Sequence, residues 1–183
     1  MVQKRHVLLC GFSGSGKSSI GPLLAREMNM KFVDIDALIE RKQRLSISEI
    51  FTLKGERFFR NLELKTVLDQ IGHTHGPAVF ALGGGALQNQ KIITTLLSTG
   101  VLVYLSCAVR ELYRRLRDLE DRPMLAGDDS SNRDEMIERI RQLLKSRVPK
   151  YRQADVQVST TNRTPEQVTR IIRQKLVQQY GFV

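Results

Sequence analysis

The stretch GFSGSGKSS, residues 11–19, decides how this chain folds. The apolar run HVLLC, residues 6–10, precedes it, and IGPLLAREM, residues 20–28, follows it with apolar residues at helical spacing. A G-x-x-x-x-G-K-S pattern between a predicted strand and a predicted helix is typical of a loop whose backbone N–H groups surround phosphate oxygens. Glycine permits the dihedral angles and the close approach that such a loop needs. We therefore predict a phosphate-binding loop at residues 11–18, called the phosphate loop below.

Two side chains of the phosphate loop have expected roles of their own. Lys17 is long enough to reach the β- and γ-phosphates of a nucleotide. Ser18 offers a hydroxyl oxygen to Mg²⁺, which prefers oxygen ligands and keeps several waters. The residues expected to contact the nucleotide in this stretch are Gly11, Ser13, Gly14, Ser15, Gly16, Lys17, Ser18 and Ser19.

The length of the chain indicates the number of domains, and its charge indicates the kind of ligand it binds. The chain has 183 residues, 41% of them hydrophobic, and no linker or low-complexity tract divides it, so we predict one domain over residues 1–183. The formal net charge of +10 is spread along the chain and forms no run of basic residues. Because aromatic residues make up only 6%, a stacking platform for bases is unsupported. We therefore expect small anionic ligands, no nucleic acid and no membrane.

The cysteines indicate a reducing compartment. Cys10 and Cys107 are the two cysteines, and both lie in apolar runs that resemble strands. They are interpreted as two buried thiols in a cytoplasmic protein, not as a disulfide or metal site. The uncharged stretch 92–109 has polar residues and Gly100 in its middle, so it is interpreted as a helix followed by a strand and not as a membrane span.

The chain alternates between short apolar segments and helical ones. We predict strands at residues 6–10, 31–34, 77–82, 101–105 and 155–159, and helices at 17–28, 37–72, 89–98, 108–117, 132–148 and from 164 onward. Uninterrupted apolar strands separated by helices indicate an α/β fold of three layers, with a parallel sheet covered by helices on both faces.

Two helix starts carry capping signals. Ser46 and Glu49 have the spacing of a capping box, in which each side chain satisfies a free backbone N–H group. Thr164 followed by Pro165 predicts an N-cap with proline at the first helical position.

Two carboxylates close the second predicted strand, at Asp34 and Asp36. This places them near the carboxyl ends of the strands, where open α/β sheets bind ligands. One of them is suited to order the waters of Mg²⁺ while the other faces a substrate hydroxyl. The alternative for Asp36 is that it caps the helix that follows.

Two further strings are unusual. ALGGGAL, residues 81–87, places three glycines directly after a predicted buried strand, which costs conformational entropy and adds no packing unless a ligand approaches the backbone closely. GERFFR, residues 55–60, ends in Arg60, for which the alternative is an ordinary solvated side chain.

Taken together, these strings resemble the shikimate kinase family over almost the whole chain. The matching motifs are GFSGSGKSSIG at 11–21, DID at 34–36, GERFFR at 55–60, LGGG at 82–85, DRPML at 121–125, SRVPKYRQAD at 146–155 and TNRTP at 161–165. The resemblance implies a P-loop fold like that of nucleoside monophosphate kinases, with five parallel strands. It also implies transfer of the γ-phosphoryl group of ATP to the 3-hydroxyl of shikimate, with Mg²⁺, by a monomer in aromatic amino acid biosynthesis.

The resemblance also implies roles for individual residues. Lys17, Asp36 and Arg122 would be catalytic, with Asp36 contacting the acceptor hydroxyl, and Ser18 and Asp34 would serve the magnesium ion. Shikimate would lie in a helical region at about 36–72, and its contacts would be Asp36, Arg60, Gly83, Gly84, Gly85 and Arg147. The additional nucleotide contacts would be Arg115, Arg122, Arg163 and Pro165.

The polar segment around residues 118–131 has the length of a functional loop. A lid that excludes water and delivers Arg122 is the functional interpretation, and a plain surface loop is the alternative.

Two other functions stay open at the level of sequence. One is another small-metabolite kinase of the same fold, such as a gluconate kinase. The other is a nucleotide-binding or RNA-associated module without enzymatic activity, which the spread of the positive charge disfavours.

Overall fold

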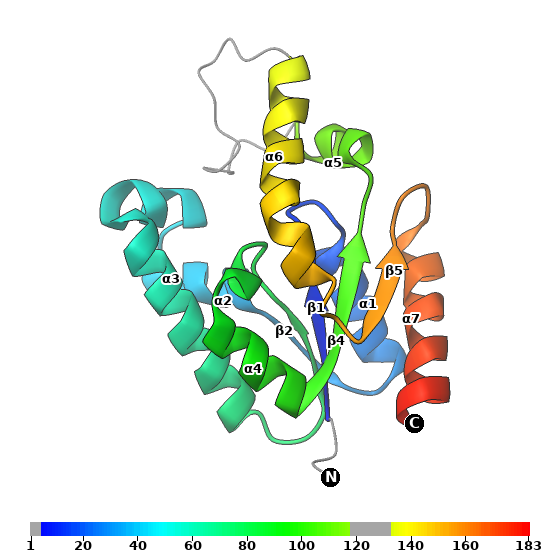
Figure 1. Cartoon of the computed structure of the whole chain (residues 1–183). Coiled ribbons are helices and arrows are strands. Elements are labelled where there is room, and N and C mark those ends of the chain that lie inside the picture. The colour runs from blue at the N-terminus through cyan, green and yellow to red at the C-terminus, as the bar shows by residue number, and fades with distance from the viewer. Residues whose placement is uncertain (1–4, 118–132) are drawn as a thin grey trace.

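The computed structural model describes residues 5–117 and 133–183, and its centre is a five-stranded parallel sheet (Figure 1). The strand order is β2-β3-β1-β4-β5. The strands are β1 (His6–Cys10), β2 (Lys31–Asp34), β3 (Ala78–Ala81), β4 (Gly100–Ser106) and β5 (Val156–Ser159). Every pairing is parallel, so the predicted α/β fold class is confirmed.

The helices lie close to their predicted positions. They are α1 (Lys17–Glu27), α2 (Ile35–Gln43), α3 (Ile47–His73), α4 (Gln90–Thr99), α5 (Val109–Leu116), α6 (Arg133–Tyr151) and α7 (Pro165–Tyr180), with a 3-10 turn η1 (Ala86–Gln88). The helix α6 continues through Pro149 and ends at Tyr151, three residues beyond the predicted end at 148. Among the described residues, no helix has both the length and the apolar character needed to cross a bilayer.

Helices cover both faces of the sheet. Because successive side chains of a strand point to opposite faces, each strand contributes to both layers of the core. In β1, Val7 and Leu9 belong to the core under α1 and α7, while Leu8 and Cys10 belong to the core under α2, α3 and α4. Figure 1 shows these two groups of helices on opposite sides of the sheet. All four of these β1 side chains are buried, which explains why the strand is uniformly apolar.

A third, smaller core anchors the start of the phosphate loop. Phe12 packs with Leu112 and Leu116 of α5 and with Ile140 of α6. These side chains are almost entirely buried. The phosphate loop is therefore held at its base by helices that come from distant parts of the sequence.

The capping predictions are confirmed. Ser46 and Glu49 form both hydrogen bonds of a capping box at the start of α3. Thr164 caps α7 in the same way with Gln167, and Pro165 follows it as expected.

The cysteine prediction is only half right. Cys10 is buried, but Cys107 is partly exposed because it lies just beyond the end of β4, outside the sheet. Both thiols are free.

The helix α3 changes direction at Gly55. This residue has φ 81° and ψ 163°, whereas the rest of α3 is helical. That conformation is almost restricted to glycine, and an added Cβ would meet no atom within 4 Å. The backbone angle, not crowding, therefore requires glycine here, and it sets the direction of the helical segment that carries Arg60.

Alanine at Gly55 should lower the free energy of unfolding by about 1–3 kcal/mol, the cost of a strained backbone angle. Gly72 is the matched control, because it lies in the same helix, is exposed and also has open space around it, but has helical angles. Gly72→Ala should raise stability by about 0.5–1 kcal/mol. Urea unfolding of both variants measures the difference, and equal effects of the two substitutions would contradict the assignment.

Candidate active site

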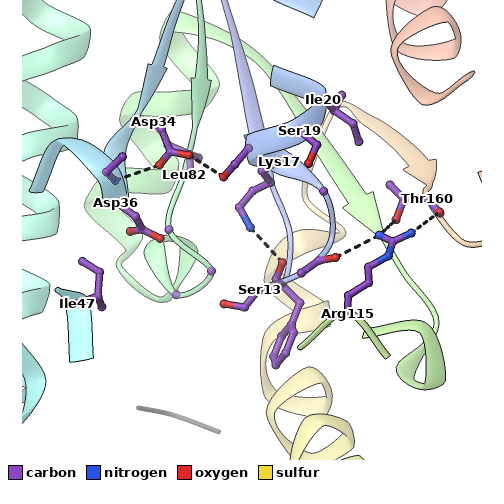
Figure 2. A pocket seen from close by; sticks show the side chains of 18 of the residues that line it. Ser13, Lys17, Ser19, Ile20, Asp34, Asp36, Ile47, Leu82, Arg115 and Thr160 are labelled. Carbon is purple, nitrogen blue, oxygen red and sulfur yellow. Dashed lines mark hydrogen bonds between the residues drawn. The ribbon is translucent and has the colours of Figure 1, made fainter. Parts of the chain in front are cut away.

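A cavity of about 1400 Å³ opens at the carboxyl ends of the strands. Its walls come from the phosphate loop, the start of α2, the α3 segment after Gly55, the glycines at 83–85, helices α5 and α6, and the turn between β5 and α7. Figure 2 shows Lys17 and Ser13 on one side of the cavity and Asp36 on the other.

Most of the residues singled out in the sequence line this cavity. They are Ser13, Gly14, Gly16, Lys17, Ser18, Ser19, Asp34, Asp36, Arg60, Gly83, Gly84, Gly85, Arg115, Arg147, Arg163 and Pro165. Gly11 and Ser15 are not among the lining residues, and both are buried. Arg122 and the segment 118–131 lie outside the described residues.

The phosphate loop has the geometry that its glycines predict. Gly16 precedes α1 with φ 101°, and the first residue of that helix is Lys17. The Lys17 ammonium donates to the carbonyl of Gly11 at 2.9 Å and to that of Phe12 at 3.1 Å, so it lies across the loop. At Gly11, an added Cβ would lie 2.5 Å from the Leu105 carbonyl oxygen, so only glycine fits against β4. The loop therefore presents its lysine to the cavity from a fixed base.

Ser18 and Asp34 bring two oxygen ligands together. The Ser18 hydroxyl donates to Asp34 Oδ2 at 2.7 Å. A hydroxyl and a carboxylate beside a phosphate loop fit Mg²⁺, which completes its shell with waters and phosphate oxygens. Within residues 5–117 and 133–183, no group of three or more His, Cys, Asp or Glu side chains forms a separate metal site.

The N-cap of α2 decides whether Asp34 or Asp36 begins this helix. Asp34 is the N-cap, and its Oδ1 accepts a hydrogen bond from the Ala37 backbone N–H at 3.3 Å. The suggestion that Asp36 caps this helix is wrong, because Asp36 lies in the first turn itself. Its carboxylate is directed toward the glycines instead: a Cβ added to Gly83 would lie 2.7 Å from Asp36 Oδ1.

Arg60 is held in a network at the cavity wall. Its Nη1 donates to Glu63 Oε2 at 2.9 Å, and its Nε and Nη2 donate to Glu56 Oε1 at 3.3 and 3.2 Å. The guanidinium carbon lies 5.1 Å from the ring centre of Phe59 and 5.7 Å from that of Phe51, within cation–π range. Because the side chain is only 21% exposed, the alternative of a solvated surface arginine is wrong.

The glycines at 83–85, called the glycine loop below, let these side chains approach the backbone. A Cβ at Gly85 would lie 2.5 Å from Arg60 Nη1, and a Cβ at Gly83 would lie 2.3 Å from Glu63 Oε1. Side chains in the glycine loop would therefore displace the charged groups that surround it.

Glu63 is a site residue that the sequence did not reveal. Its side chain is 1% exposed, and its Oε1 has no hydrogen-bond partner among the described residues. Burial raises the pKa of Glu63 to about 7, the Asp36 charge adds to this, and the Arg60 guanidinium opposes it. The one sequence signal is its i,i+3 spacing from Arg60, which is common on any charged helix.

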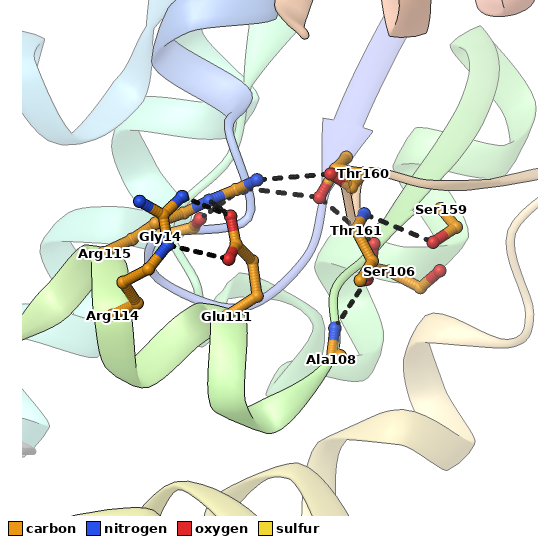
Figure 3. A network of polar contacts seen from close by, with 9 residues as sticks. All are labelled: Gly14, Ser106, Ala108, Glu111, Arg114, Arg115, Ser159, Thr160 and Thr161. Carbon is orange, nitrogen blue, oxygen red and sulfur yellow. Dashed lines mark hydrogen bonds and ion pairs between the residues drawn. The ribbon is translucent and has the colours of Figure 1, made fainter. Parts of the chain in front are cut away.

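Arg115 connects α5, the phosphate loop and the turn after β5 (Figure 3). Its Nη1 donates to the Gly14 carbonyl at 3.2 Å, its Nη2 to the Thr160 carbonyl at 3.2 Å and its Nε to Glu111 Oε1 at 2.8 Å. Hydrogen bonds from Arg114 and Arg115, of which the one from Arg114 has the larger effect, lower the pKa of Glu111 to about 2. Glu111 and Thr160 were not foreseen from the sequence, because their relation to Arg115 depends on how α5 meets the turn after β5.

A strand, a phosphate loop and a helix beside a cavity with room for a second ligand define a P-loop kinase of small molecules. The shikimate kinase family model matches residues 13–177. Curated shikimate kinases from Prosthecochloris aestuarii and Chlorobaculum tepidum are 41% and 42% identical to this chain, covering 94% of it and 89% and 94% of their own lengths. The chain therefore belongs to the shikimate kinase family and is a phosphotransferase.

Solved structures agree with this assignment. A shikimate kinase from Acinetobacter baumannii in complex with shikimate has a TM-score of 0.87 and 29% identity, covering 96% of this chain and 94% of that one. A gluconokinase from Sinorhizobium meliloti has a TM-score of 0.59 at 13% identity, covering 99% and 96%, which shows a common fold alone.

The raised pKa of Glu63 predicts a pH-dependent stability. The ordinary pKa is 4.5 and the folded value is about 7, so the folded state holds a proton between these values that the unfolded state has lost. The contribution of Glu63 to stability is therefore complete below about pH 4.5 and is lost as the pH rises through about 7. The isosteric variant Glu63→Gln lacks this titration.

Between about pH 5 and about pH 8, the unsubstituted protein should lose this contribution, whereas Glu63→Gln has none to lose. The free energy of unfolding of Glu63→Gln, relative to that of the unsubstituted protein, should therefore rise with pH, by at most about 3 kcal/mol. Glu49→Gln is the control, because hydrogen bonds at its capping box lower the pKa of Glu49, so that no titration falls in this window. A difference for Glu63→Gln that stays flat across the window would refute the assignment.

Proposed function

We propose that this protein transfers the γ-phosphoryl group of ATP to the 3-hydroxyl of shikimate. One observation carries the proposal: in one cavity, the glycine loop lies against the phosphate loop at Ser13 and against the two arginines, the partly buried Arg60 and the buried Arg147. A phosphate donor and a carboxylate-bearing acceptor can then lie next to each other beside that loop. Phosphoryl transfer needs mainly such positioning and the stabilisation of charge.

On the donor side, the phosphate loop would surround the β- and γ-phosphates. Lys17, which bridges loop carbonyls in this structure, would turn to the phosphates and stabilise the charge that spreads over the transferring group. Ser18 and Asp34 would hold Mg²⁺, which supplies positive charge to the phosphate oxygens. Arg115, Arg163 and Pro165 would lie against the adenine.

On the acceptor side, the two arginines would hold the shikimate carboxylate. Guanidinium groups bind planar carboxylates through two parallel hydrogen bonds, which fix orientation as well as position. Phe51 and Phe59, whose rings lie 4.7 Å apart beside Arg60, would offer an apolar wall to the ring of the substrate. The glycine loop would present its backbone, and Asp36 would accept the proton of the 3-hydroxyl.

A coupled assay of ADP release with shikimate, with gluconate and without an acceptor tests the reaction. We expect ADP release that requires both shikimate and Mg²⁺. Faster turnover with gluconate would assign the chain to another small-metabolite kinase. Nucleotide binding without ADP release in any of the three reactions would favour a binding module.

Arg60→Lys should raise the KM for shikimate about ten- to hundred-fold, because a point charge loses the paired hydrogen bonds worth about 1.5–3 kcal/mol. The KM for ATP should stay within about two-fold. Arg57→Lys is the control, since Arg57 belongs to the same motif but is exposed and does not line the cavity. If the KM for ATP rises as much as that for shikimate, Arg60 does not hold the acceptor.

A further inference from the structure

The carbonyl of Gly84, at the centre of the glycine loop, accepts two hydrogen bonds from α6. The Tyr151 hydroxyl donates one of them, and Arg147 Nη1 donates the other at 3.3 Å. The two donors are four residues apart, so they lie on the same face of the helix. The last turns of α6 therefore hold the glycine loop by its backbone.

Tyr151 is a rigid donor. Its side chain is 1% exposed, and its ring stacks on Tyr104 of β4 with 5.0 Å between centres and 26° between planes. Burial raises the pKa of the Tyr151 phenol well above its usual value of 10, so the hydroxyl keeps its proton at physiological pH. The position of this donor is thus set by the sheet beneath it.

Gly84 also lies against the phosphate loop. A Cβ added at Gly84 would be 3.3 Å from both the backbone nitrogen and the Oγ of Ser13. The place of Gly84 therefore sets the separation between the loop assigned to the acceptor and the loop assigned to the phosphates. A small shift of the glycine loop would change the distance across which the phosphoryl group moves.

We propose that Tyr151 is a positioning residue for phosphoryl transfer. Its hydroxyl fixes the Gly84 carbonyl, so that the glycine loop presents its backbone to the acceptor at a set distance from the phosphate loop. Tyr151 does not line the cavity, so it acts through Gly84 and not on the substrate. This role rests on the proposed function, because it assumes that the acceptor binds at the glycine loop.

The substitution Tyr151→Phe removes one hydroxyl and keeps the stacked ring. The Gly84 carbonyl then keeps only the hydrogen bond from Arg147, and the glycine loop loses one of its two α6 anchors. One hydrogen bond is worth about 0.5–1.5 kcal/mol, so kcat/KM for shikimate should fall about two- to twelve-fold. The KM for ATP should stay within about two-fold, because the contacts within the phosphate loop are unchanged.

Tyr180→Phe is a matched control. The Tyr180 hydroxyl also donates to a backbone carbonyl, that of Asp155, at 3.2 Å, and Tyr180 lies outside the cavity lining. This variant should match the unsubstituted protein in both kinetic constants, while thermal unfolding reports the loss of stability in each variant. A purely structural role for Tyr151 would lower the unfolding temperature without separating the two substrates.

The inference is overturned if Tyr151→Phe keeps kcat/KM for shikimate within two-fold of the unsubstituted protein. It is equally overturned if the KM for ATP rises by as much as kcat/KM for shikimate falls. Failure of the proposed function looks different, because the unsubstituted protein itself would then release no ADP with shikimate.

Discussion

Parallel pairing of β1 with β3 is the constraint on which the site depends. Leu9 pairs with Ala81, the last residue of β3, and the backbone N–H of Leu82, just after that strand, donates to the Leu9 carbonyl at 3.0 Å. The phosphate loop and the glycine loop therefore leave the same edge of the sheet side by side. Because β2 pairs on the other side of β3, the carboxylates of Asp34, at the end of β2, and Asp36, just after it, reach the same edge.

Two arginines of the cavity are held in place before any ligand binds. Arg60 is paired with Glu63, and Arg115 spans from Gly14 to Thr160. Groups that are already oriented need little reorganisation when charge develops in the reaction, and this is the main source of electrostatic catalysis. The raised pKa of Glu63 reflects first the cost of burying its own charge, to which the Asp36 carboxylate adds.

Local patterns in the sequence were enough to predict the sheet, the phosphate loop, the capping box of α3 and the N-cap of α7, since each depends on neighbouring residues. Aspartate is a good N-cap, so either Asp34 or Asp36 could begin α2, and only the first residue of the helix decides between them. Because α2 begins at Ile35, Asp34 is the N-cap. Glu63 and Tyr151 could not be assigned from the sequence, because their roles come from contacts with Gly83 and Gly84 that the folding of distant segments creates. The lid at residues 118–131, with Arg122, stays a prediction.

The most direct test is a crystal structure with shikimate and a non-hydrolysable ATP analogue bound together. Donor and acceptor bound next to each other at the glycine loop predict an acceptor hydroxyl about 3–3.5 Å from the γ-phosphorus and in line with the bond to be broken. The carboxylate of shikimate should then contact Arg60 and Arg147. Shikimate bound away from the glycine loop, or with its carboxylate turned from these arginines, would contradict this arrangement.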